Sequence, residues 1–310
     1  MVIEEPLKDR LAGATTELRT LKDRVFEYTW WLKKQGYAES TILSRVKLVK
    51  QLVRRGAILN DPESVKATIA KADSWSKGRK ELAVECYSNY LKFAGGTWDP
   101  PMYKRVRSLP FIPTEGELDQ LIAGCGPKTG TFLQLLKETG ARCGEAWNLE
   151  WQDLDTIKSK IRIKPEKHGN PRNLKVSRRL VERLLVLPRK SAQIFGGTQL
   201  RTMRRVYQIS RNRITAMTKN PRLKQINFHT FRHWKATKVY HRTKSLLHVM
   251  RVLGHRSIKN TMIYTHLVDF GDSDYVSKVA WNVDEACKLV EAGFEYVCDV
   301  DNGKIFRKPK

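Results

Sequence analysis

The side chains best suited to chemistry in this sequence are arginines, histidines, a lysine and a tyrosine that recur in four short segments. Arginine holds phosphate oxygens with two parallel hydrogen bonds and stays protonated, so Arg142 and Arg232 suit the charge that develops when a phosphodiester is attacked. The phenol of Tyr264 could supply the nucleophile, with a pKa of about 10 unless a basic pocket lowers it. Such chemistry needs no metal ion, and we expect no metal and no other cofactor. The four segments are TGARCGEAWNL (139–149), PEKHGNPRNLKVS (165–177), HTFRHWKAT (229–237) and VLGHRSIKNTMIYTHL (252–267).

In these segments, over about residues 113–268, the chain resembles the tyrosine recombinase, or phage integrase, family, including its Xer-like site-specific recombinases. The family pattern is an Arg in a Gly-x-Arg-x-x-Glu turn, a Lys in a β-hairpin, His-x-x-Arg-His, and Leu-Gly-His followed nine residues later by a Tyr. The resemblance implies that Lys167 protonates the departing 5′ oxygen, His229 handles the proton of the nucleophile and His255 hydrogen-bonds the phosphate. The catalytic set in chain order is Arg142, Lys167, His229, Arg232, His255 and Tyr264.

Most of these residues also have a plainer explanation. Arg142 alone could form an ordinary ion pair with Glu145 one helical turn away, and Glu145 is expected to orient the arginine. His229 and His233 lie four residues apart and could bind zinc, but no third ligand follows at a suitable distance, so His233 is expected to support the site from behind. Tyr264 could be a core aromatic residue.

Three lysines compete for the hairpin position. Lys164 and Lys175 flank Lys167 on two predicted strands, 161–164 and 173–176, joined by the turn His168-Gly-Asn-Pro. We favour Lys167 because it lies at the turn, where the lysine of the family lies.

The charge balance indicates a polyanionic partner. The chain has 58 Lys+Arg against 32 Asp+Glu, a net charge of +26 and a pI near 10.0, which favours double-stranded DNA as partner. For each basic side chain taken singly, a solvated helix face remains the alternative. The candidate DNA contacts are Arg45, Lys47, Lys50, Lys77, Arg79, Lys80, Lys104, Arg105, Arg107, Arg201, Arg204, Arg205, Arg211 and Arg213.

Apolar periodicity predicts a mainly α fold with a small β-sheet. It predicts an amino-terminal bundle of four helices, with Ser40 or Thr41 as cap of the second helix and Asp61 opening the third, and the resemblance implies that this bundle is a SAM-like core-binding domain. Thr114 and Glu117 form a capping box that starts a new domain, which the resemblance implies is an α+β catalytic domain of the tyrosine recombinase type. The predicted parts are a core-binding domain (1–100), a basic proline-containing linker (101–113), the catalytic domain (114–278) and a tail (279–310) with a helix near 283–291 and a β-hairpin.

Composition excludes several other classes. The apolar runs are only a few residues long, so no membrane-spanning helix and no membrane partner are expected. The charged amino terminus lacks the apolar region of a secretory signal, and the five cysteines form no CxxC pair. We therefore expect a cytoplasmic, nucleoid-associated protein.

Together these features predict a clamp around duplex DNA that cuts one strand through Tyr264 as a 3′-phosphotyrosyl ester and rejoins it to a partner duplex without ATP. The resemblance implies a synaptic tetramer, and the tail could dock on a neighbouring protomer (in trans) or on its own domain (in cis). Three alternatives stay open: a type IB topoisomerase, a catalytically silent DNA-binding protein on the same scaffold, and a hydrolytic nuclease.

Overall fold

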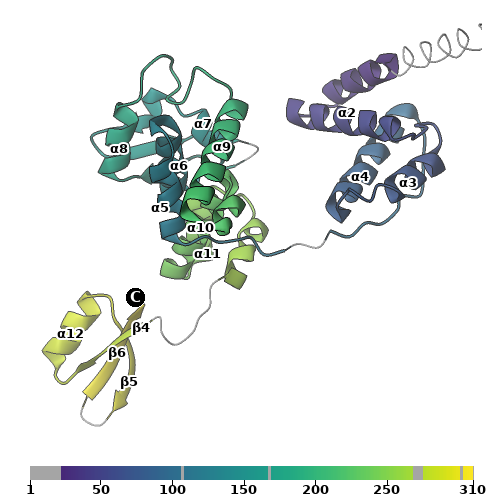
Figure 1. Ribbon diagram of the computed structural model, residues 1–310. Coiled ribbons are helices and arrows are strands. Elements are labelled where there is room, and N and C mark those ends of the chain that lie inside the picture. The colour runs from purple at the N-terminus through teal and green to yellow at the C-terminus, as the bar shows by residue number, and fades with distance from the viewer. Residues whose placement is uncertain (1–21, 106–107, 167–168, 268–274, 301–302, 310) are drawn as a thin grey trace, which may run out of the picture. The chain divides into compact units, whose positions relative to one another are not determined.

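The computed structural model describes residues 22–105, 108–166, 169–267, 275–300 and 303–309. The chain divides into two compact units, Met1–Ser108 and Leu109–Lys310, and the division lies inside the predicted 101–113 linker (Figure 1). Helices predominate in both units, and the strands form two small three-stranded sheets. Within the described ranges, no helix is long and apolar enough to cross a membrane.

The first unit packs its helices around a core rich in aromatic rings. The buried phenol of Tyr28 donates a hydrogen bond to Asn89 Oδ1 at 2.8 Å, and the buried phenol of Tyr87 donates to the carbonyl oxygen of Leu59 at 2.9 Å. Each buried hydroxyl therefore keeps a partner, as burial requires. The described helices are 22–34, α2 (Glu39–Arg54), α3 (Pro62–Ala70) and α4 (Lys77–Ala94).

The ends of these helices follow local rules, with one correction. Asp61 caps α3 by accepting a hydrogen bond from the N–H of Glu63 at 2.9 Å, as predicted. The predicted cap of α2 is wrong, because that helix begins at Glu39 after Ala38, and Ala38 offers no side-chain cap. Ser40 and Thr41 therefore lie inside the first turn.

The second unit begins with the predicted capping box: Glu117 N–H donates to Thr114 Oγ1 at 3.2 Å, and Thr114 N–H donates to Glu117 Oε2 at 2.8 Å. The first of its two three-stranded sheets is antiparallel in the order β1-β2-β3. The elements up to the tail are α5 (Glu115–Gly124), α6 (Pro127–Thr139), α7 (Cys143–Trp147), η1 (Trp151–Asp153), β1 (Leu154–Asp155), β2 (Lys160–Ile163), β3 (Arg172–Lys175), α8 (Arg178–Leu185), α9 (Leu200–Thr218), η2 (Pro221–Gln225), α10 (Phe228–Thr243), α11 (Leu246–Leu253), η3 (Ile258–Asn260) and η4 (Met262–Leu267).

Helix α6 is the centre of this unit and packs against α5, α8 and α10. The buried ring of Phe132 meets the rings of Phe195 and Phe228 edge-on, with centroid distances of 5.0 and 5.2 Å. The helix ends at Gly140, whose φ of 61° is left-handed and suits glycine. Arg142 follows two residues later, so the packing of α6 determines where Arg142 stands.

The tail is a small β-α-β-β unit rather than a helix followed by an isolated hairpin. Strand β4 (Tyr275–Ala280) precedes α12 (Val283–Glu291), and β5 (Glu295–Val300) and β6 (Gly303–Pro309) follow. The sheet order is β4-β6-β5, with β6 antiparallel to both neighbours. The helix and the hairpin strands confirm the prediction, but a boundary at 278/279 would divide β4, so the tail unit begins no later than Tyr275.

Candidate active site

Arg142 is held at the start of α7 by the carboxylate of Glu145. One carboxylate oxygen accepts from the Arg142 guanidinium at 2.8 Å, and the other accepts from the backbone N–H of Arg142 at 2.9 Å. Glu145 is 3% exposed, so the pair is largely shielded from solvent on the carboxylate side. Glu145 is therefore placed where the predicted role as orienter of Arg142 requires it, and that role stays a prediction.

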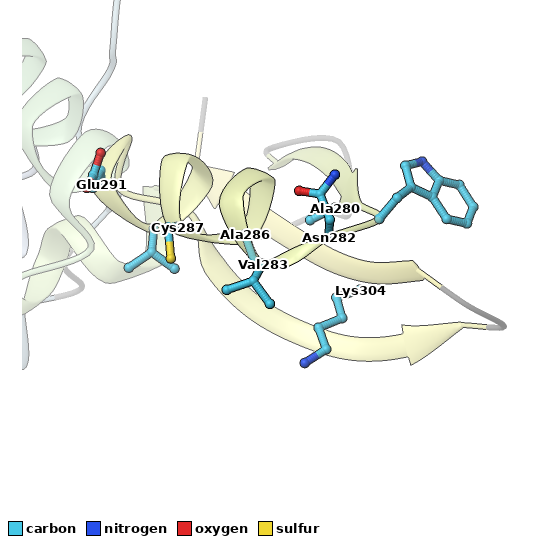
Figure 2. A pocket seen from close by; sticks show the side chains of 9 residues that line it. Ala280, Asn282, Val283, Ala286, Cys287, Glu291 and Lys304 are labelled. Carbon is cyan, nitrogen blue, oxygen red and sulfur yellow. The ribbon is translucent and has the colours of Figure 1, made fainter.

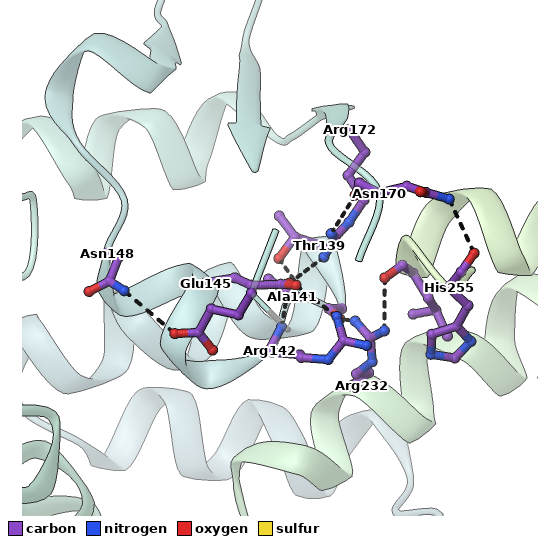
Figure 3. Close-up of polar contacts among 12 residues, drawn as sticks. Thr139, Ala141, Arg142, Glu145, Asn148, Asn170, Arg172, Arg232 and His255 are labelled. Carbon is purple, nitrogen blue, oxygen red and sulfur yellow. Dashed lines mark hydrogen bonds and ion pairs between the residues drawn. The ribbon is translucent and has the colours of Figure 1, made fainter. Parts of the chain in front are cut away.

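A second arginine, which the sequence analysis missed, binds the same carboxylate (Figure 3). Arg172, at the start of β3 and 8% exposed, donates to Glu145 Oε2 at 2.6 Å. Burial alone would raise the pKa of Glu145, but the hydrogen bonds and charges of Arg172 and Arg142 outweigh it and hold that pKa below its ordinary value. Glu145 therefore stays ionised between two guanidinium groups.

Arg232 lies on α10 and is almost fully buried, at 2% exposure. Its guanidinium donates to the carbonyl oxygen of Gly140 at 2.7 Å and to that of Leu253 at 2.8 Å (Figure 3). Because each of these nitrogens carries two hydrogens, donors remain for a phosphate. Burial first, and then the nearby charges of Arg142 and Arg172, lower the pKa of Arg232, and this concentration of positive charge favours binding of an anion there.

His255 follows the left-handed Gly254 at the end of α11. Its ring Nδ1 lies 2.9 Å from Oγ1 of Thr261, a residue with no solvent exposure. The side-chain amide of Asn170 donates to the carbonyl oxygen of His255 at 3.3 Å and ties the histidine to the hairpin (Figure 3). Burial first, then Arg232 and Arg142, lower the pKa of His255 to about 3, so the ring is neutral near pH 7.

Tyr264 lies in η4, buried in a small apolar cluster with α10 and α11, and is 2% exposed. Its hydroxyl oxygen lies 3.1 Å from Nδ1 of His233, whereas the exposed His229 stacks edge-on against the His233 ring at 4.6 Å. His233, expected behind the site, therefore contacts Tyr264, the predicted nucleophile. A lowered tyrosine pKa is not found: burial outweighs the charges of Arg232 and Arg142 and raises the pKa of Tyr264 to about 12.

Lys167, the predicted proton donor, lies outside the described residues, and so does His168. The chain is described again at Gly169, whose N–H donates to the carbonyl oxygen of Glu166 at 3.2 Å across the turn. The alternative Lys164 is engaged elsewhere, since its ammonium contacts Glu150 at 2.6 Å and Asp153 at 3.2 Å. These ion pairs disfavour Lys164, and the assignment of Lys167 stays a prediction.

The predicted DNA contacts divide into exposed and engaged side chains. Nine are exposed: Lys47, Lys50, Lys77, Lys104, Arg105, Arg201, Arg204, Arg205 and Arg213. Of these, Arg213 donates to the carbonyl oxygen of Gly124, and Arg204 contacts the Cys143 sulfur. Arg107 lies outside the described residues.

Four of the predicted DNA contacts are half-buried and have structural partners. The side chain of Arg45 is 15% exposed, pairs with Glu85 at 3.2 Å and lies over the ring of Tyr37, so its predicted outward position is wrong. The other three donate short hydrogen bonds within the protein: Arg79 to Gln51, Lys80 to the Ala70 carbonyl and Arg211 to the Ile226 carbonyl.

Known proteins with similar sequences and structures identify the class. The model of the phage integrase family matches residues 114–269, half of the chain. A tyrosine recombinase of Thermosipho africanus is 23% identical over 246 residues, covering 71% of this chain and 83% of that protein. Tyrosine recombinase XerA of Pyrococcus horikoshii is 24% identical over 255 residues, covering 78% and 88%. A lambda integrase tetramer bound to a Holliday junction has the same fold, with a TM-score of 0.61 at 16% identity over 80% of this chain and 76% of that chain.

The chain therefore belongs to the phage integrase family of tyrosine recombinases, enzymes that cut and rejoin DNA. The resemblance drawn from the four motif segments and the predicted fold class are both confirmed. In the described part of the chain, no group of three or more His, Cys, Asp or Glu side chains is placed to hold a metal ion.

Proposed function

We propose that this chain is a site-specific recombinase that cleaves one DNA strand through Tyr264, holds it as a 3′-phosphotyrosyl ester and rejoins it to a partner duplex. The observation that carries the proposal is the position of Arg232, whose guanidinium donates to the carbonyl oxygens of Gly140 and Leu253. Those carbonyls lie two residues before Arg142 and two residues before the histidine of Leu-Gly-His. One buried side chain thus links the segment that carries Arg142 to the segment that carries His255, the residues that we propose bind the phosphate.

The chemistry follows from the types of these side chains. Arg142, Arg232 and His255 donate hydrogen bonds to the non-bridging oxygens as negative charge develops. The Tyr264 oxygen bonds to phosphorus while the bond to the 5′ oxygen breaks, and Lys167 gives the departing oxygen its proton. Each step exchanges one phosphodiester for another, so the reaction needs no ATP. The guanidinium groups of Arg142 and Arg232 stabilise the developing negative charge, so the proposed reaction needs no metal ion for that purpose.

The test is covalent trapping on DNA. Duplexes from the genomic neighbourhood of the coding sequence, nicked so that the cleaved fragment diffuses away, should give a protein–DNA adduct that survives SDS, also in EDTA. Tyr264→Phe should abolish the adduct and leave DNA binding almost unchanged. The control is Tyr296→Phe, which changes an exposed tyrosine of the tail and should leave adduct formation normal. An adduct formed by Tyr264→Phe would refute the proposal, and relaxation of plasmids without any specific site would indicate a topoisomerase.

We propose double-stranded DNA as the partner and a synaptic tetramer as the active assembly. Support comes from the net charge of +26 and from the fold shared with the lambda integrase tetramer bound to a Holliday junction. Because the substrate would be DNA, we place the activity in the cytoplasm, at the nucleoid. Sequencing the junctions formed on paired sites would show strand exchange directly. Products in which each strand is rejoined only to its own duplex would contradict the proposed recombination.

We also propose that the tail docks in trans on a neighbouring copy of the chain. Residues 275–310 carry six basic and six acidic side chains in a chain of net charge +26, so their charge does not favour phosphate. Beside α12 lies a hollow of 530 Å³ lined by Val283, Ala286, Cys287 and Val290 (Figure 2). Val283 and Val290 are 77% and 58% exposed, an apolar surface that is stabilised when protein covers it.

A pair of charge substitutions separates docking in trans from docking in cis. Val283→Glu with Val290→Glu should abolish the complex of two paired sites while binding to one half-site survives. Ser277→Glu, on the exposed part of β4 and outside the hollow, is the control and should assemble normally. If the double variant forms the paired complex and recombines normally, docking in trans is wrong.

A further inference from the structure

The two histidines of His-x-x-Arg-His have different surroundings. His233 Nδ1 lies 3.1 Å from the Tyr264 hydroxyl oxygen, within hydrogen-bond distance, and their ring centroids are 5.8 Å apart. His229 is exposed on the first turn of α10 and meets the His233 ring edge-on at 4.6 Å. The histidine that touches the nucleophile is therefore one turn further along α10 than the histidine that the resemblance assigns to its proton.

Tyr264 needs an internal proton acceptor because water has little access to it. The residue is 2% exposed and packs in an apolar cluster with Ala236, Val239 and Leu253. Its pKa is raised to about 12, so very little phenolate exists near pH 7. Attack on phosphorus must therefore be coupled to removal of the phenolic proton.

We propose that His233 is a catalytic residue and that its Nδ1 accepts the phenolic proton of Tyr264 during cleavage. The inference rests on the proposed recombinase function. As the Tyr264 oxygen bonds to phosphorus, its proton moves to Nδ1 of His233, the bond from phosphorus to the 5′ oxygen breaks, and that oxygen takes a proton from a separate acid, Lys167 in the proposed mechanism. In the rejoining step a 5′ hydroxyl oxygen bonds to phosphorus and gives its proton to Lys167, the bond from phosphorus to Tyr264 breaks, and the proton on His233 returns to the Tyr264 oxygen.

The charges around the pair keep the His233 ring unprotonated until the phosphate binds. The groups that act on His233 are His229 and Arg232 of the same helix, and those that act on Tyr264 are Arg232 and Arg142. Burial first, and then His229 and Arg232, lower the pKa of His233 to about 4, so the ring is neutral near pH 7 and accepts at Nδ1 when its hydrogen is on Nε2. Negative charge on the attacked phosphate would offset the cations and favour the protonated ring.

The test compares three variants in the adduct assay. His233→Ala removes the base, His233→Asn keeps a short polar side chain that cannot take a proton, and His241→Ala, at an exposed histidine near the other end of the same helix, is the matched control. Both His233 variants should form the adduct about 10²–10⁴-fold more slowly than the native chain, the usual contribution of a general base. DNA binding and the thermal unfolding temperature, measured on each variant, report whether the fold is kept.

Three readouts separate proton transfer from a merely structural role. Added imidazole should restore adduct formation by His233→Ala but not by His233→Asn, whose side chain fills part of the space. The adduct rate of His233→Asn should rise about tenfold per pH unit in the alkaline range as Tyr264 phenolate forms, whereas the native rate stays level above the pKa of His233. A DNA substrate with sulfur in place of the departing 5′ oxygen needs no acid, so the defect of His233→Asn should persist on it.

The inference is overturned if both His233 variants cleave at the native rate. It is equally overturned if they are slow but keep the native pH profile and do not respond to imidazole, because His233 would then only position Tyr264. Failure of the proposed function would look different: the native chain itself would give no adduct, or Tyr264→Phe would still give one.

Discussion

Replacing Arg172 with methionine would test how strongly the buried ion pair supports the active site. The variant removes a guanidinium that lies 2.6 Å from Glu145 and keeps most of the apolar stem of the side chain. Breaking a buried pair by removing one partner costs about 3–5 kcal/mol, because the other charge is left in a dry environment. Glu145 keeps two hydrogen bonds from Arg142, so we expect the lower end, about 3 kcal/mol.

Native-state hydrogen exchange of the amides of α6 and α10 is a suitable assay, because it reports the unfolding free energy of this unit alone. Lys238→Met is the control, since it breaks an ion pair with Glu115 in which both side chains are about half exposed and should cost at most about 1 kcal/mol. If Arg172→Met lowers the unfolding free energy no more than Lys238→Met does, the carboxylate does not depend on Arg172 and the reasoning fails.

The same variant makes a prediction about pH. The pKa of Glu145 is held below its ordinary value in the folded state, so the stabilisation is fully present above the unfolded pKa of about 4.3 and is lost as the pH falls through the folded value. The free-energy gap between the native chain and Arg172→Met should therefore be full at neutral pH and shrink in acid below about pH 4. A gap that grows on acidification would contradict this assignment of the charge.

Three further outcomes can be checked. Gly254→Ala should lower the unfolding temperature, at a cost of about 1–3 kcal/mol in unfolding free energy. The backbone at this residue is in the left-handed region, and a Cβ there would lie 2.7 Å from Arg172 Nη1 and 2.7 Å from the Asn170 carbonyl oxygen. Thr261→Val should slow adduct formation about tenfold by leaving His255 Nδ1 without its hydroxyl partner, a loss of about 1–1.5 kcal/mol, and Thr261→Ser should restore it. If about 6–10 phosphates are neutralised, DNA affinity should fall about 10³–10⁵-fold between roughly 50 and 200 mM salt, and a flat response would mean that the excess positive charge is not directed at DNA.

The features that could be predicted from the sequence depend on neighbours within a few residues. The Thr114–Glu117 capping box, the Asp61 cap and helix 283–291 are local patterns of side chain and backbone, and each is found where it was predicted. The assignment of Arg142, Arg232 and Tyr264 as catalytic residues is a prediction of the same local kind, because their motifs place each one at a fixed distance from a glycine or histidine.

The features that were missed depend on contacts between distant parts of the chain. Arg172 is 27 residues from Glu145, so no local pattern links them, although its place on a strand beside the hairpin turn was a usable signal. Arg45 lies at the edge of the apolar face of α2, and its inward position depends on Glu85, 40 residues away. The tail strand β4 pairs with β6 across the whole tail, which leaves little local signal in its own residues.

Under the proposed function, the charges of the site explain why its polar network also includes groups that are not expected to bind the phosphate. Glu145 and Arg172 form a buried pair whose charges cancel, which leaves Arg142 and Arg232 as two uncompensated cations before Lys167 is counted. A phosphodiester carries one negative charge, and attack by the phenolic oxygen after loss of its proton brings the reacting centre to two. Arg232 is fixed by two carbonyl oxygens and Arg142 by a carboxylate, so neither must reorganise when that second charge appears. The arrangement therefore matches the transition state better than the bound DNA, which is the condition for binding energy to increase the rate of cleavage.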